Sequence, residues 1–160
     1  MRIVSLTPSA SEIIFELGLG SSLVGVSHEC NFPTEVNKLE KLSSSSINPH
    51  GSQSDIDFQV RETLQTNDSL YQINTERLND LKPDFIVTQG ICDVCSISSS
   101  QIEVVLKGTL CTLPASTKII SLNGRTFDGI CEDIMMLGNE LHSIDSAKNH
   151  VDTARNAKEK

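Results

Sequence analysis

The chain has 160 residues, 38% of them hydrophobic and 21% charged, which is the composition of one ordinary globular domain with a real core. Its formal net charge of -8 leaves no surplus of Lys and Arg to neutralise phosphates, so nucleic acids and anionic membrane surfaces are excluded as partners. No window approaches the roughly 20 apolar residues that span a bilayer. The first residues are also too short an apolar run for a secretory signal, so the chain as written is expected to be cytoplasmic.

A strand, a helix and a second strand are predicted at the start of the chain. Residues 3–6 form a short apolar run, and the sequence Ser-Ala-Ser-Glu at positions 9–12 has the form of a capping box at a helix start. Gly18 and Gly20 are expected to end this helix, and residues 23–27 form the next strand of a right-handed βαβ unit. The predicted buried face of the helix is made of Ala10, Ile13, Ile14 and Leu17.

The middle of the chain is predicted to hold a long loop and a helix. Residues 39–53 are rich in Ser, Asn, Pro and Gly, and positions 43–46 are an unbroken serine run, so this segment is interpreted as a loop crossing the sheet edge. Ser54 is the predicted cap of the helix that follows. Its apolar residues line up at four-residue spacing, at Ile56, Val60 and Leu64.

A buried strand is predicted at residues 85–87. Residues 69–73 form a short edge strand before it, and Asn74 caps a short helix that ends before Pro83, because proline cannot continue a helix. The continuous apolar run of Phe, Ile and Val at 85–87 is typical of a strand buried on both faces of a parallel sheet. The run ends in a turn at 88–95.

The last third of the chain is predicted to contain a helix at 100–108, a strand at 118–122 and a helix that starts at Thr126. The apolar face of that last helix is Ile130, Ile134, Leu137 and Leu141. Beyond Asp145 the apolar pattern thins without adding a further core. Residues 126–160 are therefore interpreted as the start of a long helix that leads to an absent second lobe.

These elements predict an α/β fold, a three-layer sandwich with a mainly parallel sheet flanked by helices, as in a Rossmann-like lobe. Residues 1–125 form the lobe and residues 126–160 the start of the joining helix. Ligands bind at the carboxyl ends of the strands in such sheets, so the turns that follow the strands are the candidate binding site. The candidate ligand-binding residues are Pro8, Ser9, His28, Glu29, Cys30, Gln89, Gly90 and Cys92.

The five cysteines are spaced irregularly, which indicates free thiols rather than a disulfide framework. Cys92 and Cys95 form a C-x-x-C pair, which is a redox dithiol in some proteins and half of a zinc site in others. Only His28 and Cys30 are near enough in the predicted fold to complete four zinc ligands. The alternative is that both cysteines only pack a turn. Similarly, Pro8 and Ser9 either hold an anion at a helix start or merely cap it.

Four stretches together resemble the helical-backbone class of ABC-transporter substrate-binding proteins, in its cobalamin-binding branch. They are residues 2–12 (RIVSLTPSASE), 23–33 (LVGVSHECNFP), 69–95 (with SLYQIN and TQGICDVC) and 119–138. The resemblance covers nearly the whole chain. It implies a two-lobed protein with ligand in the cleft between the lobes, of which this chain looks like the amino-terminal lobe.

The resemblance also implies a function for particular residues. Proteins of this class deliver a corrinoid or metal chelate to a membrane permease, and they are exported or lipid-anchored. Glu76 falls where the first lobe of such proteins places an acidic residue that pairs with permease arginines. Corrinoid receptors often contact the macrocycle with aromatic side chains, and the matching positions here are Glu29 and Gln89.

The sequence therefore predicts a solute-binding protein that binds a corrinoid or metal chelate and is not an enzyme. It contains no nucleophile elbow, P-loop, dinucleotide-binding glycine motif or H-E-x-x-H. No cofactor is expected, cobalamin being a ligand. The rival interpretation is an intracellular thiol-redox or metal-binding protein that uses Cys92 and Cys95. A third is self-association of the isolated lobe through its uncovered cleft wall.

Overall fold

The computed structural model describes residues 1–66, 70–90 and 113–158. Its centre is a five-stranded sheet in the order β3-β2-β1-β6-β7, in which every neighbouring pair is parallel. The strands are β1 (Ile3–Ser5), β2 (Leu23–Val26), β3 (Glu40–Lys41), β6 (Phe85–Gln89) and β7 (Lys118–Leu122). The predicted α/β class with a mainly parallel sheet is confirmed.

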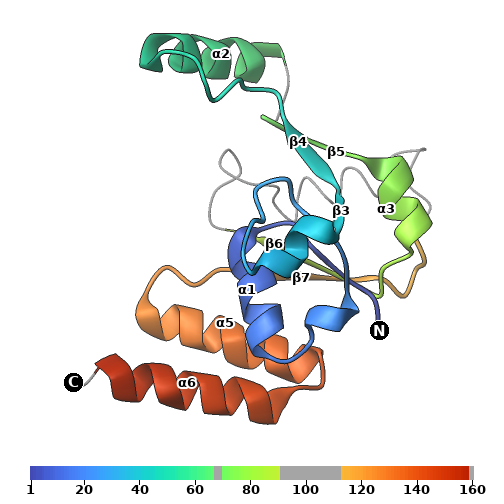
Figure 1. Cartoon of the computed structure of the whole chain (residues 1–160), viewed down its shortest axis with the longest axis vertical. Coiled ribbons are helices and arrows are strands. Elements are labelled where there is room, and N and C mark those ends of the chain that lie inside the picture. Colours follow the sequence, from blue (N-terminus) through green and yellow to red (C-terminus); the bar gives the residue numbers. More distant parts are fainter. Residues whose placement is uncertain (67–69, 91–112, 159–160) are drawn as a thin grey trace.

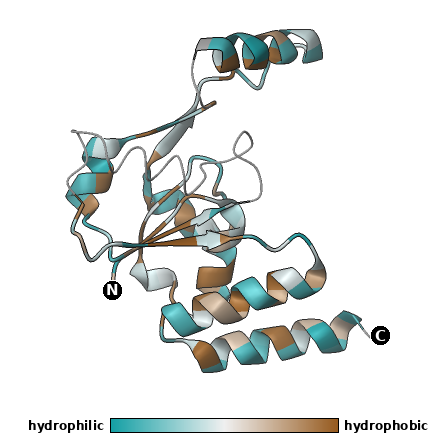
Figure 2. Cartoon of the chain, turned by 180° about the vertical axis from the view of Figure 1, so that it is seen from behind, coloured by the Kyte–Doolittle hydropathy of each residue, from teal (hydrophilic) through white to brown (hydrophobic). Residues whose placement is uncertain are grey.

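The central strands are buried because they carry apolar side chains on both faces. In β1, Ile3 and Val4 are both inaccessible to solvent, and in β6 the same holds for Ile86 and Val87. Successive side chains of a strand point to opposite faces, so these pairs supply two separate cores. Figure 2 shows the hydrophobic strands at the centre of the molecule, between helices of mixed hydropathy.

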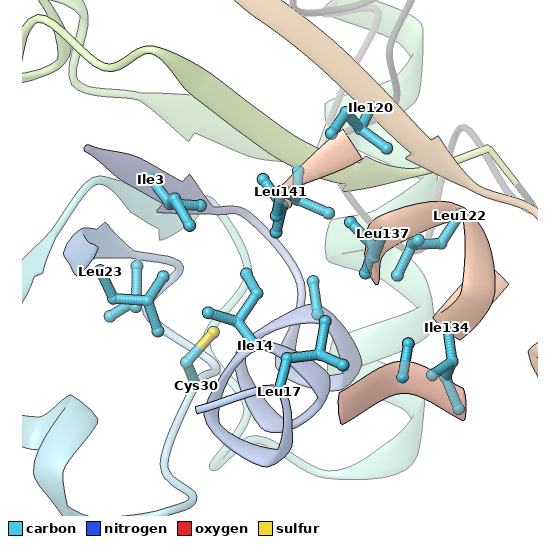
Figure 3. Close-up of a cluster of buried hydrophobic side chains, with 14 of the residues drawn as sticks. Ile3, Ile14, Leu17, Leu23, Cys30, Ile120, Leu122, Ile134, Leu137 and Leu141 are labelled. Atoms are coloured by element: carbon cyan, nitrogen blue, oxygen red, sulfur yellow. The ribbon is translucent and has the colours of Figure 1, made fainter. Parts of the chain in front are cut away.

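The larger core lies between the sheet and three helices, α1 (Pro8–Glu16), α5 (Phe127–Glu140) and α6 (Ile144–Lys158). Figure 3 shows Ile14 of α1 and Leu17 at the end of that helix between the strands and the α5 residues Ile134 and Leu137. The smaller core lies on the other face, where α3 (Thr75–Leu81) contributes Leu78 against Val4 and Ile86. Helices therefore flank the sheet on both faces, as predicted.

The start of α1 differs from the predicted capping box. Helix α1 begins at Pro8, so the N-cap is Thr7, and the Thr7 side chain makes no capping hydrogen bond. Proline is favoured at the first helical position because its missing N–H would have no partner there. The end of the helix agrees with the prediction, since Gly18 has a φ of +77° and only glycine adopts this conformation without strain.

The serine run is a strand, which corrects the predicted loop at 39–53. Strand β4 (Ser43–Ser45) pairs antiparallel with β5 (Tyr71–Ile73), and this two-stranded sheet stands apart from the main one. It carries α2 (Gln53–Thr66) away from the body of the molecule (Figure 1). Ser52, rather than the predicted Ser54, caps α2. Its Oγ accepts a hydrogen bond from the Asp55 backbone N–H, and its own backbone N–H donates one to the Asp55 carboxylate.

The segment after residue 126 is two helices, which corrects the prediction of one long helix. Thr126 caps α5 as predicted, but α5 ends at Glu140 and the chain reverses through His142, which has a φ of +58°. Helices α5 and α6 then lie side by side (Figure 1), and Ala147 and Val151 are buried between α6 and the body. Whether residues 126–160 lead to a second lobe stays a prediction.

Within the described ranges, no helix combines the length and the apolar character that crossing a membrane requires.

Candidate ligand-binding edge

The carboxyl ends of the five parallel strands lie along one edge of the sheet, which we call the carboxyl edge. It is formed by the segments that follow or end β1, β2, β3, β6 and β7, at residues 6–9, 27–30, 42–43, 88–90 and 122–124. The predicted site residues at 8–9, 28–29 and 89–90 all belong to these segments. The structure therefore brings together residues from three distant parts of the sequence.

Thr7, which follows β1, makes a side-chain contact with β6 at this edge. Its Oγ1 donates a hydrogen bond to Gln89 Oε1 at 3.3 Å and lies 3.5 Å from Ser9 Oγ. The Thr7 side chain is available for this contact because it does not cap α1. Gln89 is held in β6 opposite Leu122, and Gly90 donates its N–H to the Leu122 carbonyl at 2.8 Å. Half-buried Gln89 and exposed Ser9 are thus fixed next to each other.

His28 is held by a serine pair. Its Nδ1 lies 2.7 Å from Ser43 Oγ, and the same oxygen accepts the His28 backbone N–H at 3.1 Å. The Ser43 hydroxyl in turn donates to Ser27 Oγ at 3.2 Å. The His28 ring lies 5.7 Å from the Tyr71 ring, centroid to centroid, at an angle of 46°. Ring orientation at this position is therefore set by contacts on two sides.

Cys30 lies in the larger core rather than with the exposed edge residues. Its side chain is 1% exposed, and its Sγ accepts a hydrogen bond from Ser11 Oγ at 3.2 Å. Burial raises the pKa of the Cys30 thiol above its ordinary value, although the Ser11 hydroxyl partly opposes this. The thiol is consequently held neutral. Ligand contact through Cys30, or zinc binding together with His28, would require the side chain to leave the core.

An apolar hollow opens beside His28. It has a volume of about 660 Å³, within the size range of small-molecule sites. The polar part of its wall is His28, Glu29, Ser44 and Ser45. The apolar part comes from Ile56 and Val60 of α2, from Tyr71 of β5, and from Ile47, Pro49 and Leu70 in the neighbouring segments. Predicted site residues and a cavity thus coincide at one end of the carboxyl edge.

Only some of the residues that line this hollow could be predicted from the sequence. Ile56, Val60 and Leu64 were predicted to lie in one row of a helix. Ile56 and Val60 are half-buried in the hollow wall, whereas Leu64 of the same row is 40% exposed. The contact of Ser43 with His28 was not predicted, because a serine run is typical of a loop. Tyr71 was predicted to lie in an edge strand, but nothing in the sequence linked that strand to His28.

The predicted functions of the Cys92–Cys95 pair and of Glu76 are not tested by the structure. Cys92 and Cys95 lie outside the described residues, so the redox and zinc interpretations of the pair stay predictions. Among the residues that the structure does describe, no group of three or more His, Cys, Asp or Glu side chains is arranged to hold a metal ion. Glu76 is exposed in the first turn of α3, and its pairing with a permease also stays a prediction.

Comparison with known proteins decides the family. The family model described as periplasmic binding protein matches residues 3–160, which is nearly the entire chain. The chain belongs to the periplasmic binding protein family. This membership confirms the family resemblance predicted from the four sequence stretches, and it does not favour the thiol-redox or metal-handling alternative.

Individual relatives agree with this assignment. The vitamin B12-binding protein of Vibrio vulnificus is 34% identical over 86 residues, which are 54% of this chain and 22% of the relative. Among solved structures, the vitamin B12-binding protein of Vibrio cholerae matches with a TM-score of 0.65 at 22% identity, over 97% of this chain and 47% of that one. A heme-binding protein of Pseudomonas aeruginosa matches with a TM-score of 0.65 at 18% identity, over 97% of this chain and 43% of that one.

These coverages have a direct consequence for architecture. The chain spans about half the length of the solved structures that it matches. At these identities the structural matches establish the fold, and the ligands named for those proteins remain theirs.

Proposed function

We propose that this chain forms one lobe of the solute-binding component of an ABC-type uptake system, and that its carboxyl edge holds one side of a corrinoid or another metal chelate. The observation that carries the proposal is the apolar hollow beside His28, at the edge where polar residues from β1, β2 and β6 meet. Ligands of open parallel sheets bind at this edge. Vitamin B12 and heme, named for the matched relatives, are both metal complexes of a macrocycle.

The two parts of the edge suit different parts of such a ligand. The flat face of a macrocycle would lie against the apolar wall, where Val60 and Tyr71 are half-buried. Its polar periphery would meet hydroxyl and amide groups such as those of Ser44 and Gln89. Affinity would come from the burial of apolar area and from a few hydrogen bonds. No bond is made or broken in this function, so we expect no enzymatic activity.

The course of α6 supports a two-lobed cleft. Helix α5 starts at the carboxyl edge after β7, and α6 returns alongside it, because Lys158 Nζ lies 4.4 Å from the centroid of the Phe127 ring. Residues that follow α6 would therefore start beside the carboxyl edge. A second lobe placed there would supply the other wall of a cleft along the carboxyl edge, and Glu76 would remain exposed for a permease.

The proposal is tested by equilibrium titration of the chain with cyanocobalamin and with haemin. Val60→Asp places a charge in the apolar wall and should weaken binding at least tenfold, because a buried carboxylate without a partner is costly. Leu64→Asp is the matched control, since Leu64 lies one turn further along α2 and does not line the hollow. Helix content measured by circular dichroism should be equal in the two variants.

Two results would contradict the proposal. Absence of binding by both ligands would remove the function altogether. Equal loss of affinity in the Val60 and Leu64 variants would show that the hollow is not where the ligand lies.

A further inference from the structure

We propose that the groove between α1 and α5 is a docking surface for a partner protein that presents a basic amphipathic helix. The groove lies on the face of the sheet that carries the larger core, whereas α3, with Glu76 in its first turn, packs on the other face. This surface is therefore distinct from the one that Glu76 would offer to a permease. The proposal does not depend on the ligand of the carboxyl edge.

The groove is apolar along much of its length, yet part of this apolar surface meets solvent. Its volume is about 620 Å³, and its lining includes half-buried Ile13 of α1 and buried Ile134 of α5. Phe32 and Ile130 also line it, and they are 59% and 46% exposed. An exposed apolar patch with a polar rim marks an interaction site in soluble proteins. The core does not use these two side chains, so a partner is the means by which they would become buried.

The shape of the groove suits a helix. Helix α1 lines it with residues three, four and seven positions from the first, which are Ser9, Glu12, Ile13 and Glu16. Residues at this spacing share one face of a helix, and here they extend over two turns, or about 10 Å. A second helix laid along that face would place its own side chains, at the same spacing, into the groove. Amphipathic helices bind apolar grooves in this way.

The rim of the groove carries negative charge. Glu12 and Glu16 come from α1 and Glu35 from the short 3-10 helix Thr34–Lys38, and all three are exposed. Glu12 and Glu16 lie one turn apart, so their carboxylates repel each other. Among the described residues no Lys or Arg lines the groove, and the one ion pair there joins His150 Nδ1 to Glu16 Oε2 at 3.5 Å.

This charge specifies the chemistry of the partner. Lys or Arg side chains beside the apolar face of a bound helix would relieve the repulsion between the carboxylates and would fix the direction of the helix. An acidic helix would add to the repulsion. The partner segment is therefore a helix with an apolar stripe about two turns long, flanked by Lys or Arg.

The test uses three synthetic peptides. The probe is a helical peptide with leucine at i, i+3, i+4 and i+7 and lysine on both flanks. One control peptide has glutamate in place of every lysine, and the other has the residues of the probe in scrambled order. Fluorescence anisotropy should show that the probe binds at one site, about tenfold more tightly than either control. Amide shifts of the nitrogen-15-labelled chain should concentrate at residues 9–16, 32–35 and 130–134.

Variants of the chain separate docking in the groove from general attraction between a cationic peptide and an acidic protein. Phe32→Ser should weaken binding of the probe about tenfold, because an apolar contact is lost. Phe58→Ser is the matched control, since Phe58 is 60% exposed on α2 and does not line the groove. Circular dichroism should show equal helix content in the two variants.

The charge of the rim is tested in the same way. The double variant Glu12→Gln, Glu16→Gln should weaken binding about fivefold and reduce its salt dependence. The double variant Glu132→Gln, Asp152→Asn removes two charges from a hollow between α5 and α6 instead, and should bind as the parent chain does.

Four results would overturn the proposal. They are no binding of the probe, equal binding of the glutamate peptide, unchanged affinity in Phe32→Ser, and shifts at the groove on concentrating the chain alone. The last result would make a second copy of the chain the occupant. Each of them leaves the proposed function standing, because the titrations with cyanocobalamin and haemin concern the carboxyl edge.

Discussion

The contact between α5 and α6 can be tested by adding one methyl group. In Gly138→Ala, the new Cβ would lie 2.4 Å from the Cβ of Ala147 and 3.2 Å from the Ser143 carbonyl oxygen. Carbon atoms in contact prefer a separation of about 3.5–4.0 Å, so the helices would have to move apart by about 1 Å. Overpacking of this kind costs about 1–3 kcal/mol, whereas replacing glycine by alanine inside a helix gains about 1 kcal/mol. The difference is a net loss of about 0–2 kcal/mol, and because a Cβ–Cβ approach of 2.4 Å is far inside contact distance we expect a value near the upper end, about 2 kcal/mol.

Urea unfolding followed by circular dichroism measures this loss directly. For a chain of this size, a loss of about 2 kcal/mol lowers the midpoint of thermal unfolding by about 4–8 °C. The double variant with Gly138→Ala and Ala147→Gly restores the space and should recover part of the stability beyond additivity. Asn139→Ala, at an exposed position of α5, is the control for helix propensity alone. A Gly138→Ala chain as stable as the parent or more so would refute the packing of α6 on α5.

Three further predictions concern single side chains. Because burial raises the pKa of the Cys30 thiol, the thiol of the unfolded chain ionises at a lower pH than the thiol of the folded chain. The free energy of unfolding should therefore fall as pH rises above about 9, and this fall should be smaller in Cys30→Ala. Urea titrations at pH 7 to 10 measure it, and equal slopes would contradict it. The Ser52 hydroxyl and amide lower the pKa of Asp55, so Ser52→Ala should move that pKa back toward the ordinary value of 3.8 in a carboxyl NMR titration. Thr126→Ala removes the cap of α5 and should cost about 1 kcal/mol in urea unfolding, whereas no change would mean that water replaces the cap.

Much of the sheet could be predicted from the sequence because its strands are continuous apolar runs. The run at 85–87 lies in β6, a strand inside the sheet with Ile86 and Val87 buried, as expected of a strand covered on both faces. The run at 118–122 is also a parallel strand, at the edge of the sheet, with Ile120 and Leu122 buried. The serine run at 43–46 could not be predicted in this way. It forms a strand through backbone hydrogen bonds to β5, which is distant in the sequence, and backbone pairing leaves no apolar pattern in the side chains.

In α5 and α6, the apolar spacing of the sequence predicted only part of the buried face. The apolar spacing from Ile134 to Leu141 predicted the buried face of α5, but Ile130 in the same row is 46% exposed. Ala147 and Val151 looked too sparse for a core when counted alone. They are buried because α6 folds back on α5, and the close approach of Gly138 and Ala147 permits this.

The candidate site was predicted to the level of segments and not of side chains. Parallel topology alone places the residues after β1, β2 and β6 on one edge, and Thr7 and Gln89 are in fact hydrogen-bonded there. Topology does not say which way each side chain points. His28 turns toward Ser43 and the hollow, whereas Cys30, two residues later, turns into the core toward Ser11.

The central claim is that the carboxyl edge is the ligand-binding surface, and amide chemical shifts of the nitrogen-15-labelled chain test it most directly. Zinc protoporphyrin is a suitable probe because it is diamagnetic. The account predicts that shifts concentrate at residues 7–9, 27–29, 43–45 and 88–90. Shifts concentrated instead along the groove that Phe32 and Ile130 line between α1 and α5 would contradict it, as would no shift at all.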